Sequence, residues 1–94
     1  MRIASLAPSN TDILVALGLE EDIVGADDWS DLPASSEVVR LGGETSIDLG
    51  KLNDLKPDIV LSSLSVPGME KVVKSVEGLG LRQVVLNPET LDEV

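Results

Sequence analysis

The feature that most constrains the fold is a regular alternation of short apolar segments with amphipathic ones. The apolar segments are rich in β-branched side chains, which is typical of strands buried on both faces. They are Ile3–Leu6, Ile23–Ala26, Ile59–Ser62 and Val84–Leu86. Val38 and Val39 predict a further short extended piece before the turn at Leu41-Gly42-Gly43.

Helices are predicted between these strands. The first begins after Ser9, an expected N-cap with Asp12 three residues later in capping-box spacing, and ends at Gly18. The second begins near Asp48 and ends before Pro57. Its apolar face consists of Leu49, Leu52 and Leu55.

The third helix has the clearest amphipathic pattern. Its apolar residues fall at i, i+3, i+4 and i+7, and they are Met69, Val72, Val73 and Val76. Glu70 and Lys74 form an i, i+4 pair on the exposed side, and Gly78 and Gly80 end the helix. After Pro88, residues 90–94 predict a fourth helix that has only begun, so we expect the chain to be cut there.

The order of these elements predicts an α/β fold. Strands that alternate with helices pair in parallel through right-handed crossovers. We therefore expect one domain over residues 1–94, a three-layer sandwich whose mostly parallel sheet of about four strands is flanked by helices, Rossmann-like or flavodoxin-like. Ligands of such sheets bind beyond the carboxyl ends of the strands. The loops expected at that rim are Pro8–Thr11, Asp27–Ser30, Gly42–Thr45, Ser62–Val66 and Asn87–Pro88.

Trp29 is the one aromatic residue, since the chain has no Phe and no Tyr. The core must therefore be built from aliphatic side chains and Met. Trp29 lies in an acidic, broken segment just after an apolar strand. Two interpretations are open: the indole is a platform for a ligand, or it folds back and caps the core.

The composition excludes most catalytic sites. Without His, Cys or Tyr there is no Ser-His-Asp triad, thiol nucleophile, imidazole base or zinc cage, so we expect no enzyme, no cofactor and no metal. Asp27, Asp28 and Asp31 are interpreted as hydrated loop charges. Neither Gly42-Gly43 nor Gly50-Lys51 has the spacing of a phosphate-binding loop. A phosphoryl-transfer receiver domain is a distant third interpretation, because Ser62 and Ser63 stand where the aspartate is needed.

Charge limits the partners. The net charge is −10, and no Lys or Arg occurs between Ile3 and Val39, which argues against nucleic acid and anionic membranes as partners. No apolar run is long enough for a membrane span. Because the first strand directly follows Met1 and Arg2, the chain is expected either to have lost a leader or to be cytoplasmic.

Several segments, in order along the chain, resemble one family. The opening, Arg2 to Leu14, reads RIASLAPSNTDIL and is followed by Ile23-Val24-Gly25 and Asp28-Trp29-Ser30-Asp31-Leu32-Pro33. The later matching segments are Leu41-Gly42-Gly43, Leu55–Leu61 and Pro88–Val94. Together they are similar to the cobalamin and ferric-siderophore class of ABC-transporter substrate-binding proteins, which have two α/β lobes joined by a long helix.

The resemblance implies that residues 1–94 form the amino-terminal lobe and that residues 90–94 begin the interlobe helix. It also implies a ligand, which would be cobalamin, haem or a ferric siderophore. The residues implied to face it are Pro8, Ser9, Asn10, Trp29, Gly42, Gly43, Ser63 and Ser65. The family's usual permease-docking Glu falls at Gly50, so Asp48 or Glu44 is the substitute.

The leading hypothesis is therefore a non-catalytic, extracytoplasmic binding component of an ABC importer, which works with permease subunits and a missing carboxyl-terminal lobe. Two alternatives stay open. One is a stand-alone flavodoxin-like interaction module, for example a homodimer that rebuilds the cleft. The other is a leaderless cytoplasmic relative without a transport role, if Met1 is the native start.

Overall fold

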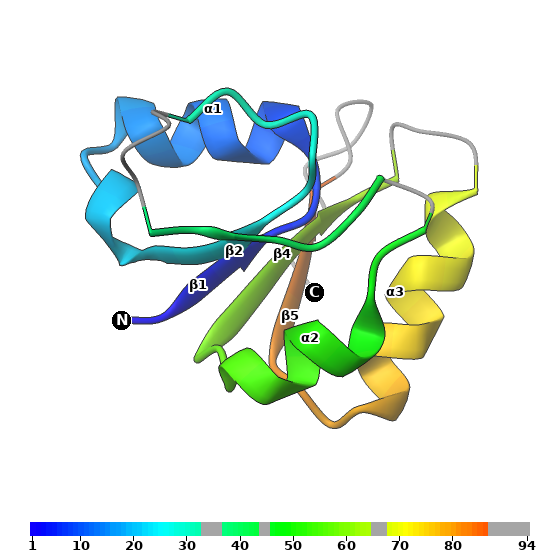
Figure 1. Ribbon diagram of the computed structural model, residues 1–94. Helices are drawn as coiled ribbons and strands as arrows, with labels where there is room; N and C mark the ends of the chain where they lie inside the picture. The colour runs from blue at the N-terminus through cyan, green and yellow to red at the C-terminus, as the bar shows by residue number, and fades with distance from the viewer. Residues whose placement is uncertain (33–36, 44–45, 65–67, 87–94) are drawn as a thin grey trace.

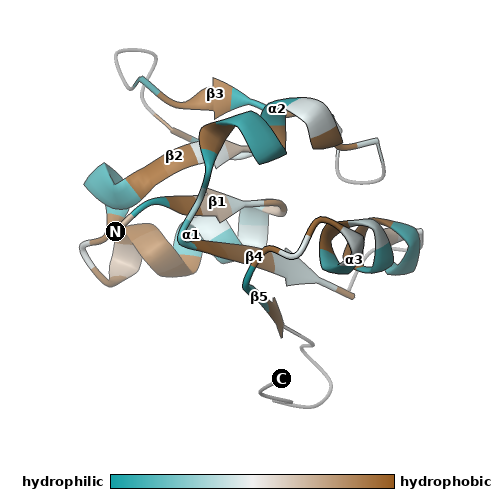
Figure 2. Ribbon diagram, turned by 90° about the horizontal axis from the view of Figure 1, so that it is seen from below, coloured by the Kyte–Doolittle hydropathy of each residue, from teal (hydrophilic) through white to brown (hydrophobic). Residues whose placement is uncertain are grey.

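A parallel five-stranded sheet forms the centre of the computed structural model, which describes residues 1–32, 37–43, 46–64 and 68–86. The strands are β1 (Ile3–Ser5), β2 (Ile23–Ala26), β3 (Val39–Arg40), β4 (Ile59–Ser63) and β5 (Gln83–Leu86). Their order is β3-β2-β1-β4-β5, as Figure 2 shows from top to bottom. The predicted α/β class with parallel pairing is confirmed.

The sheet has one strand more than the pattern predicts. The extended piece expected at Val38–Val39 is β3, which pairs with β2 through Gly25–Val39 and Ala26–Arg40. Two residues are too few to show an alternation in sequence. The strand exists because the chain returns along the edge of β2.

Helices cover both faces of the sheet, because the chain reverses its direction across it. From β1 it moves outward to β2 through α1 (Pro8–Ala16) and the 3₁₀ turn η1 (Glu20–Asp22). It then returns from β3 to β4 through α2 (Leu49–Leu55) and continues to β5 through α3 (Met69–Gly78). Right-handed crossovers in opposite directions place α1 on one face and α2 and α3 on the other (Figure 1).

The start of α1 differs from the prediction. The helix begins at Pro8, its N-cap is Ala7, and no side chain caps it, so Ser9 is not the N-cap and the capping box with Asp12 is wrong. Proline at the first helical position has no N–H to satisfy and already has the helical φ. The helix ends as predicted, just before Gly18, whose φ is +77°.

The other two helices follow the sequence pattern closely. Asp48 is the N-cap of α2 and its Oδ1 accepts a hydrogen bond from the Lys51 N–H at 3.1 Å. The helix ends at Lys56, whose φ of 49° is left-handed. In α3, Met69, Val72 and Val76 are buried. The fourth helix expected after Pro88 lies outside the described residues.

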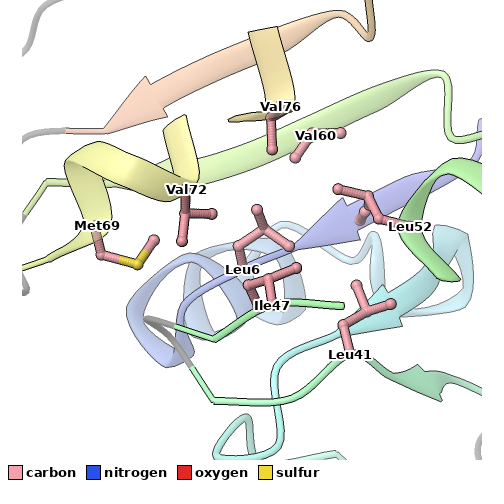
Figure 3. Close-up of a cluster of buried hydrophobic side chains, with 9 residues drawn as sticks. Leu6, Leu41, Ile47, Leu52, Val60, Met69, Val72 and Val76 are labelled. Carbon is pink, nitrogen blue, oxygen red and sulfur yellow. The ribbon is translucent and has the colours of Figure 1, made fainter. Parts of the chain in front are cut away.

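Two aliphatic clusters form the core. The larger one lies between the sheet and α2 and α3 (Figure 3), and it consists of Ala4, Leu6, Leu41, Ile47, Leu52, Val60, Met69, Val72 and Val76. The smaller one lies under α1, and it consists of Ile3, Leu14, Ile23, Ala26 and Leu32. Successive residues of a strand therefore supply opposite clusters, as the pleat of a strand requires. Within the described ranges, no helix has the length and apolar character needed to cross a membrane.

Truncation of the larger cluster should destabilise the fold. Leu52 is fully buried between α2 and the sheet, and Leu52→Ala is expected to lower the free energy of unfolding by about 2–5 kcal/mol. Urea unfolding followed by far-UV circular dichroism measures this loss. The matched control is Leu17→Ala, because Leu17 is 68% exposed, and its change should stay within about 0.5 kcal/mol. Equal losses in the two variants would contradict this assignment of the core.

Candidate functional site

The carboxyl ends of all five strands lie at one edge of the sheet, because every pairing is parallel. The chain leaves β1 and β4 in opposite directions across the sheet, so these neighbouring strands form its topological switch point. In open α/β sheets the ligand crevice lies outside the carboxyl ends of the strands at such a point. We call this edge the binding rim, defined by residues 7–10, 27–31, 41–43 and 64, which follow β1, β2, β3 and β4.

Trp29 is 72% exposed on the binding rim. The sequence left two interpretations of this ring open, and the structure excludes the one in which it caps the core. A single exposed apolar side chain is common on protein surfaces, so exposure alone does not assign Trp29 a role. The contacts of this loop therefore decide how the ring is presented.

The carboxylate of Asp27 holds the loop that carries Trp29. This side chain is fully buried. Its Oδ2 accepts a hydrogen bond from the Trp29 backbone N–H at 3.1 Å, which is an Asx turn. Its Oδ1 accepts a short hydrogen bond from the hydroxyl of Ser30. One buried carboxylate thus bonds both residues that follow Asp28.

Two further hydroxyl groups connect Ser30 to the first strand. Thr11 Oγ1 lies 2.7 Å from Ser30 Oγ and 2.7 Å from Ser5 Oγ, and all three residues are buried. A hydroxyl has one proton to donate, and Ser30 donates its own to Asp27. Thr11 therefore donates to Ser30, and Ser5 donates to Thr11. We call this set (Ser5, Thr11, Ser30 and Asp27) the hydroxyl chain, and it ties the Trp29 loop to α1 and β1.

The loop after β3 holds the Trp29 loop from the other side. Arg40 Nη1 donates to the carbonyl oxygens of Asp27 at 2.8 Å and Ser30 at 2.9 Å. The Asp28 N–H donates to the Gly42 carbonyl at 2.8 Å, and Asp28 Oδ1 accepts from the Gly42 N–H at 3.2 Å. The backbone on both sides of Trp29 is therefore fixed while its ring stays in solvent.

Gly43 brings bare backbone close to the indole, and Gly42 shapes the turn before it. A Cβ built on Gly43 would lie 3.9 Å from Trp29 Nε1. At Gly42 the φ is +109°, and a Cβ would lie only 2.7 Å from the Ser46 carbonyl oxygen. Gly42 is thus required by backbone conformation and space. The structure brings Trp29, Gly42 and Gly43 together, as the site prediction grouped them.

The other predicted ligand contacts differ in exposure. Ser9 is exposed and Pro8 is half-buried, whereas Asn10 and Ser63 are 1% and 2% exposed. Among the described residues, the Asn10 side-chain nitrogen has no hydrogen-bond partner. Asn10 and Ser63 therefore shape the loops at the switch point from inside, and Leu64, next to Ser63, is the side chain exposed there, at 42%.

Some predicted residues lie outside the described ranges. These are the ligand contact Ser65, the docking substitute Glu44 and the rim residues Asn87 and Pro88. The other docking substitute, Asp48, is exposed but uses its carboxylate to cap α2. Gly50, the family's usual docking position, is exposed in the first turn of that helix.

The structure corrects the interpretation of Asp27 as a hydrated loop charge. Asp28 and Asp31 are exposed, but Asp27 is fully buried. Sequence reasoning also missed the roles of Arg40 and the hydroxyl chain. One signal was available in the sequence. Asp27 at the start of a turn, followed by Ser30 three residues later, is a common pattern in which the aspartate bonds the turn that follows it. The contact with Thr11 spans nineteen positions, and only the folded chain reveals it.

The described ranges contain no group of three or more His, Cys, Asp or Glu side chains that could hold a metal ion. The arrangement at the binding rim offers instead an exposed indole, an adjoining strip of bare backbone and two exposed carboxylates. Such a surface can stack against a ring and accept hydrogen bonds from its edge.

Known proteins resemble this chain along most of its length. The family model described as periplasmic binding protein matches residues 3–79. A vitamin B12-binding protein of Vibrio cholerae is 32% identical over 94 residues, which cover 99% of this chain and 34% of that protein. An uncharacterised ABC transporter substrate-binding lipoprotein of Bacillus subtilis is 32% identical over 87 residues, which cover 92% of this chain and 28% of that protein.

The fold is also found in solved structures. A periplasmic heme-binding protein from Pseudomonas aeruginosa superposes with a TM-score of 0.75 at 30% identity. The superposition covers 92% of this chain and 31% of that one. This chain thus spans about a third of the length of the relatives it matches.

Removing the Ser30 hydroxyl from the hydroxyl chain should destabilise the protein. Ser30→Ala leaves Thr11 without its acceptor and deprives the buried Asp27 carboxylate of a donor. We expect a loss of about 1–3 kcal/mol in the free energy of unfolding, measured in urea. Ser9→Ala is the matched control, because Ser9 is exposed and does not cap α1. A loss as large for Ser9→Ala would restore the rejected N-cap.

A side chain at Gly42 should also destabilise the loop beside Trp29. Gly42→Ala places a Cβ against the Ser46 carbonyl at a positive φ, so we expect a loss of more than about 1 kcal/mol. Gly50→Ala, in the exposed first turn of α2, should instead raise the stability by up to about 1 kcal/mol. Thermal melts of both variants measure the difference, and the same sign for both would contradict the strained conformation at Gly42.

Proposed function

We propose that this chain, which belongs to the periplasmic binding protein family, supplies one lobe of the ligand cleft of an ABC importer's substrate-binding protein. The proposed ligand is a corrinoid or an iron chelate such as haem or a ferric siderophore. The relatives whose names state a ligand include a vitamin B12-binding and a heme-binding protein. These ligands share a large ring or chelate face that an indole can cover.

The observation that carries the proposal is the exposure of Trp29 on a fixed loop. The largest apolar side chain of the chain is 72% exposed, although the loop is bonded on one side by Asp27 and on the other by Arg40. A ring held in place before binding loses little conformational freedom when a ligand covers it. Tryptophan is for this reason among the residues that contribute most to binding energy.

The proposed cleft needs a second surface. Small-molecule sites bury most of the ligand surface, whereas the binding rim offers one side. We propose that residues 1–94 are the amino-terminal lobe and that the interlobe helix starts near residue 90, as in the two-lobed family. The carboxyl-terminal lobe would then close the cleft over Trp29. A second copy of the chain that closes the same cleft is the competing arrangement, which light scattering detects as a dimer.

We infer that the protein binds its ligand without changing it. Proteins of this family bind and deliver a substrate, and a chain without His, Cys and Tyr lacks the side chains most used for acid–base and nucleophilic chemistry. We also place the protein outside the cytoplasmic membrane, since its relatives include a lipoprotein. The exposed carboxylate of Asp48 is the proposed contact for basic permease residues, with Glu44 four positions earlier in the sequence as the other candidate.

Titration of the single tryptophan tests the proposal. Because Trp29 is the one aromatic residue, all tryptophan emission of the protein reports on the binding rim. Cobalamin, haem or a ferric siderophore should quench it saturably. Trp29→Ala should weaken binding of the same ligand at least tenfold by calorimetry. It should leave the unfolding midpoint unchanged, because the ring is exposed.

The control for the titration is an inert absorber of matched size and spectrum, which removes light without binding. Leu17→Ala is the matched variant control, because Leu17 is equally exposed on α1, away from the binding rim. Equal quenching by ligands and inert absorbers, or equal affinities of the Trp29→Ala variant and the unsubstituted chain, would reject the proposed function.

A further inference from the structure

Three of the positive charges of this lobe lie at the end of the sheet opposite Trp29. Of the seven Lys and Arg residues, Arg2, Lys56 and Arg82 precede β1, β4 and β5. They therefore lie at the amino ends of the strands, opposite the binding rim. Arg40 ends β3 near the rim, but its Nη1 is bonded to the Trp29 loop. No Lys or Arg occurs in residues 33–36, 44–45, 65–67 or 87–94.

At the starts of α2 and α3, the other usual anion sites, a carboxylate of the protein already accepts one backbone N–H. The Asp48 carboxylate accepts the Lys51 N–H in the first turn of α2. At the start of α3, Glu70 Oε2 accepts the Gly68 N–H at 2.9 Å. A ligand carboxylate or phosphate needs these same N–H groups. It would therefore have to displace a carboxylate of the protein.

The start of α1 has few N–H groups left for an anion. Pro8 has no N–H, and the N–H groups of Asn10 and Thr11 both donate to the Ala7 carbonyl. Two lysines lie in the first turns of helices, Lys51 in α2 and Lys71 in α3. Lys71 lines a shallow hollow with Ser46 and Ile47 on the α2 side of the sheet.

Around Trp29 itself the side chains are acceptors. Asp28 and Asp31 are exposed on either side of the ring in sequence, and Asp28 Oδ1 already bonds the Gly42 N–H. Carboxylates here favour N–H donors and repel other carboxylates. The rim therefore combines a ring platform with an edge that accepts hydrogen bonds and carries negative charge.

From these contacts we propose that the lobe selects a macrocycle edged by neutral amides, a corrinoid, over chelates edged by carboxylates, such as haem with its propionates. The indole of Trp29 covers the ring, and Asp28 and Asp31 accept N–H bonds from the amide edge. This inference rests on the proposed function, because it concerns which ligand the same rim takes. A single carboxylate in place of one ligand amide adds repulsion without changing the ring.

A matched pair of ligands tests this selection. Cyanocobalamin and its monocarboxylic acid, in which one peripheral amide is hydrolysed, have the same absorbing ring, so absorption artefacts cancel in Trp29 quenching. We expect the acid to bind about five- to tenfold more weakly at low salt. The ratio should shrink towards one as the ionic strength rises, because exposed charges are screened.

Two variants identify the source of the repulsion. Asp31→Asn should lower the ratio between the two ligands, because it removes an exposed charge beside Trp29. Glu21→Gln removes one exposed charge from η1, which precedes β2 at the other edge of the sheet, and should leave the ratio unchanged. Haem, with two carboxylates, should bind more weakly than cyanocobalamin to the unsubstituted chain.

The outcomes distinguish a failure of the charge selection from a failure of the proposed binding function. Equal or tighter binding of the acid, or an effect of Glu21→Gln as large as that of Asp31→Asn, would overturn the charge selection and leave the binding function standing. A second result would overturn both the proposed function and the selection. In it, neither cobalamin ligand quenches Trp29 emission more than an inert absorber does, and neither haem nor a ferric siderophore binds.

Discussion

Parallel pairing around β1 is the constraint on which the rest of this structure depends. Because β2 and β4 both pair with β1 in parallel, and the outer strands pair in parallel with them, every strand ends at the same edge. The loops that follow the strands therefore lie together at this edge even where they do not contact one another. The reversal of the chain at β1 also forces helices onto both faces. The aliphatic clusters and the binding rim are thus consequences of one strand order.

The rim places a polar network where an aliphatic core ends. The hydroxyl chain and the Asp27 carboxylate are buried, and burial of polar groups is unfavourable unless they are hydrogen-bonded. Each has a partner in this network. These bonds tie the loop that carries Trp29 to α1 and β3 directly and to β1 through Thr11. The exposed ring is therefore held by its backbone, with no need of contacts to its own side chain.

The proposed function rests on the combination of fixed loop, exposed indole and charge distribution. In the proposed two-lobed arrangement, a second lobe would cover the apolar ring that this lobe leaves in solvent. The network around Asp27 accounts for the ring's fixed position. Carboxylates at the helix N-termini and beside Trp29 give the rim an acceptor character that a macrocycle with donor groups on its edge complements.

The sequence alone was sufficient for the α/β class, the carboxyl ends of α1 and α2, the N-cap of α2 and the apolar faces of α2 and α3, because hydrophobic period and terminal Gly, Pro and Asp residues act locally. It also placed Trp29 on a polar loop. Local patterns predicted an extended piece at Val38–Val39 but not its pairing at the edge of the sheet, and they predicted neither the start of α1 at Pro8 nor the burial of Asp27. These features depend on tertiary structure, because a two-residue edge strand exists only beside β2, and a carboxylate is buried only where hydroxyls and N–H groups from distant segments meet it.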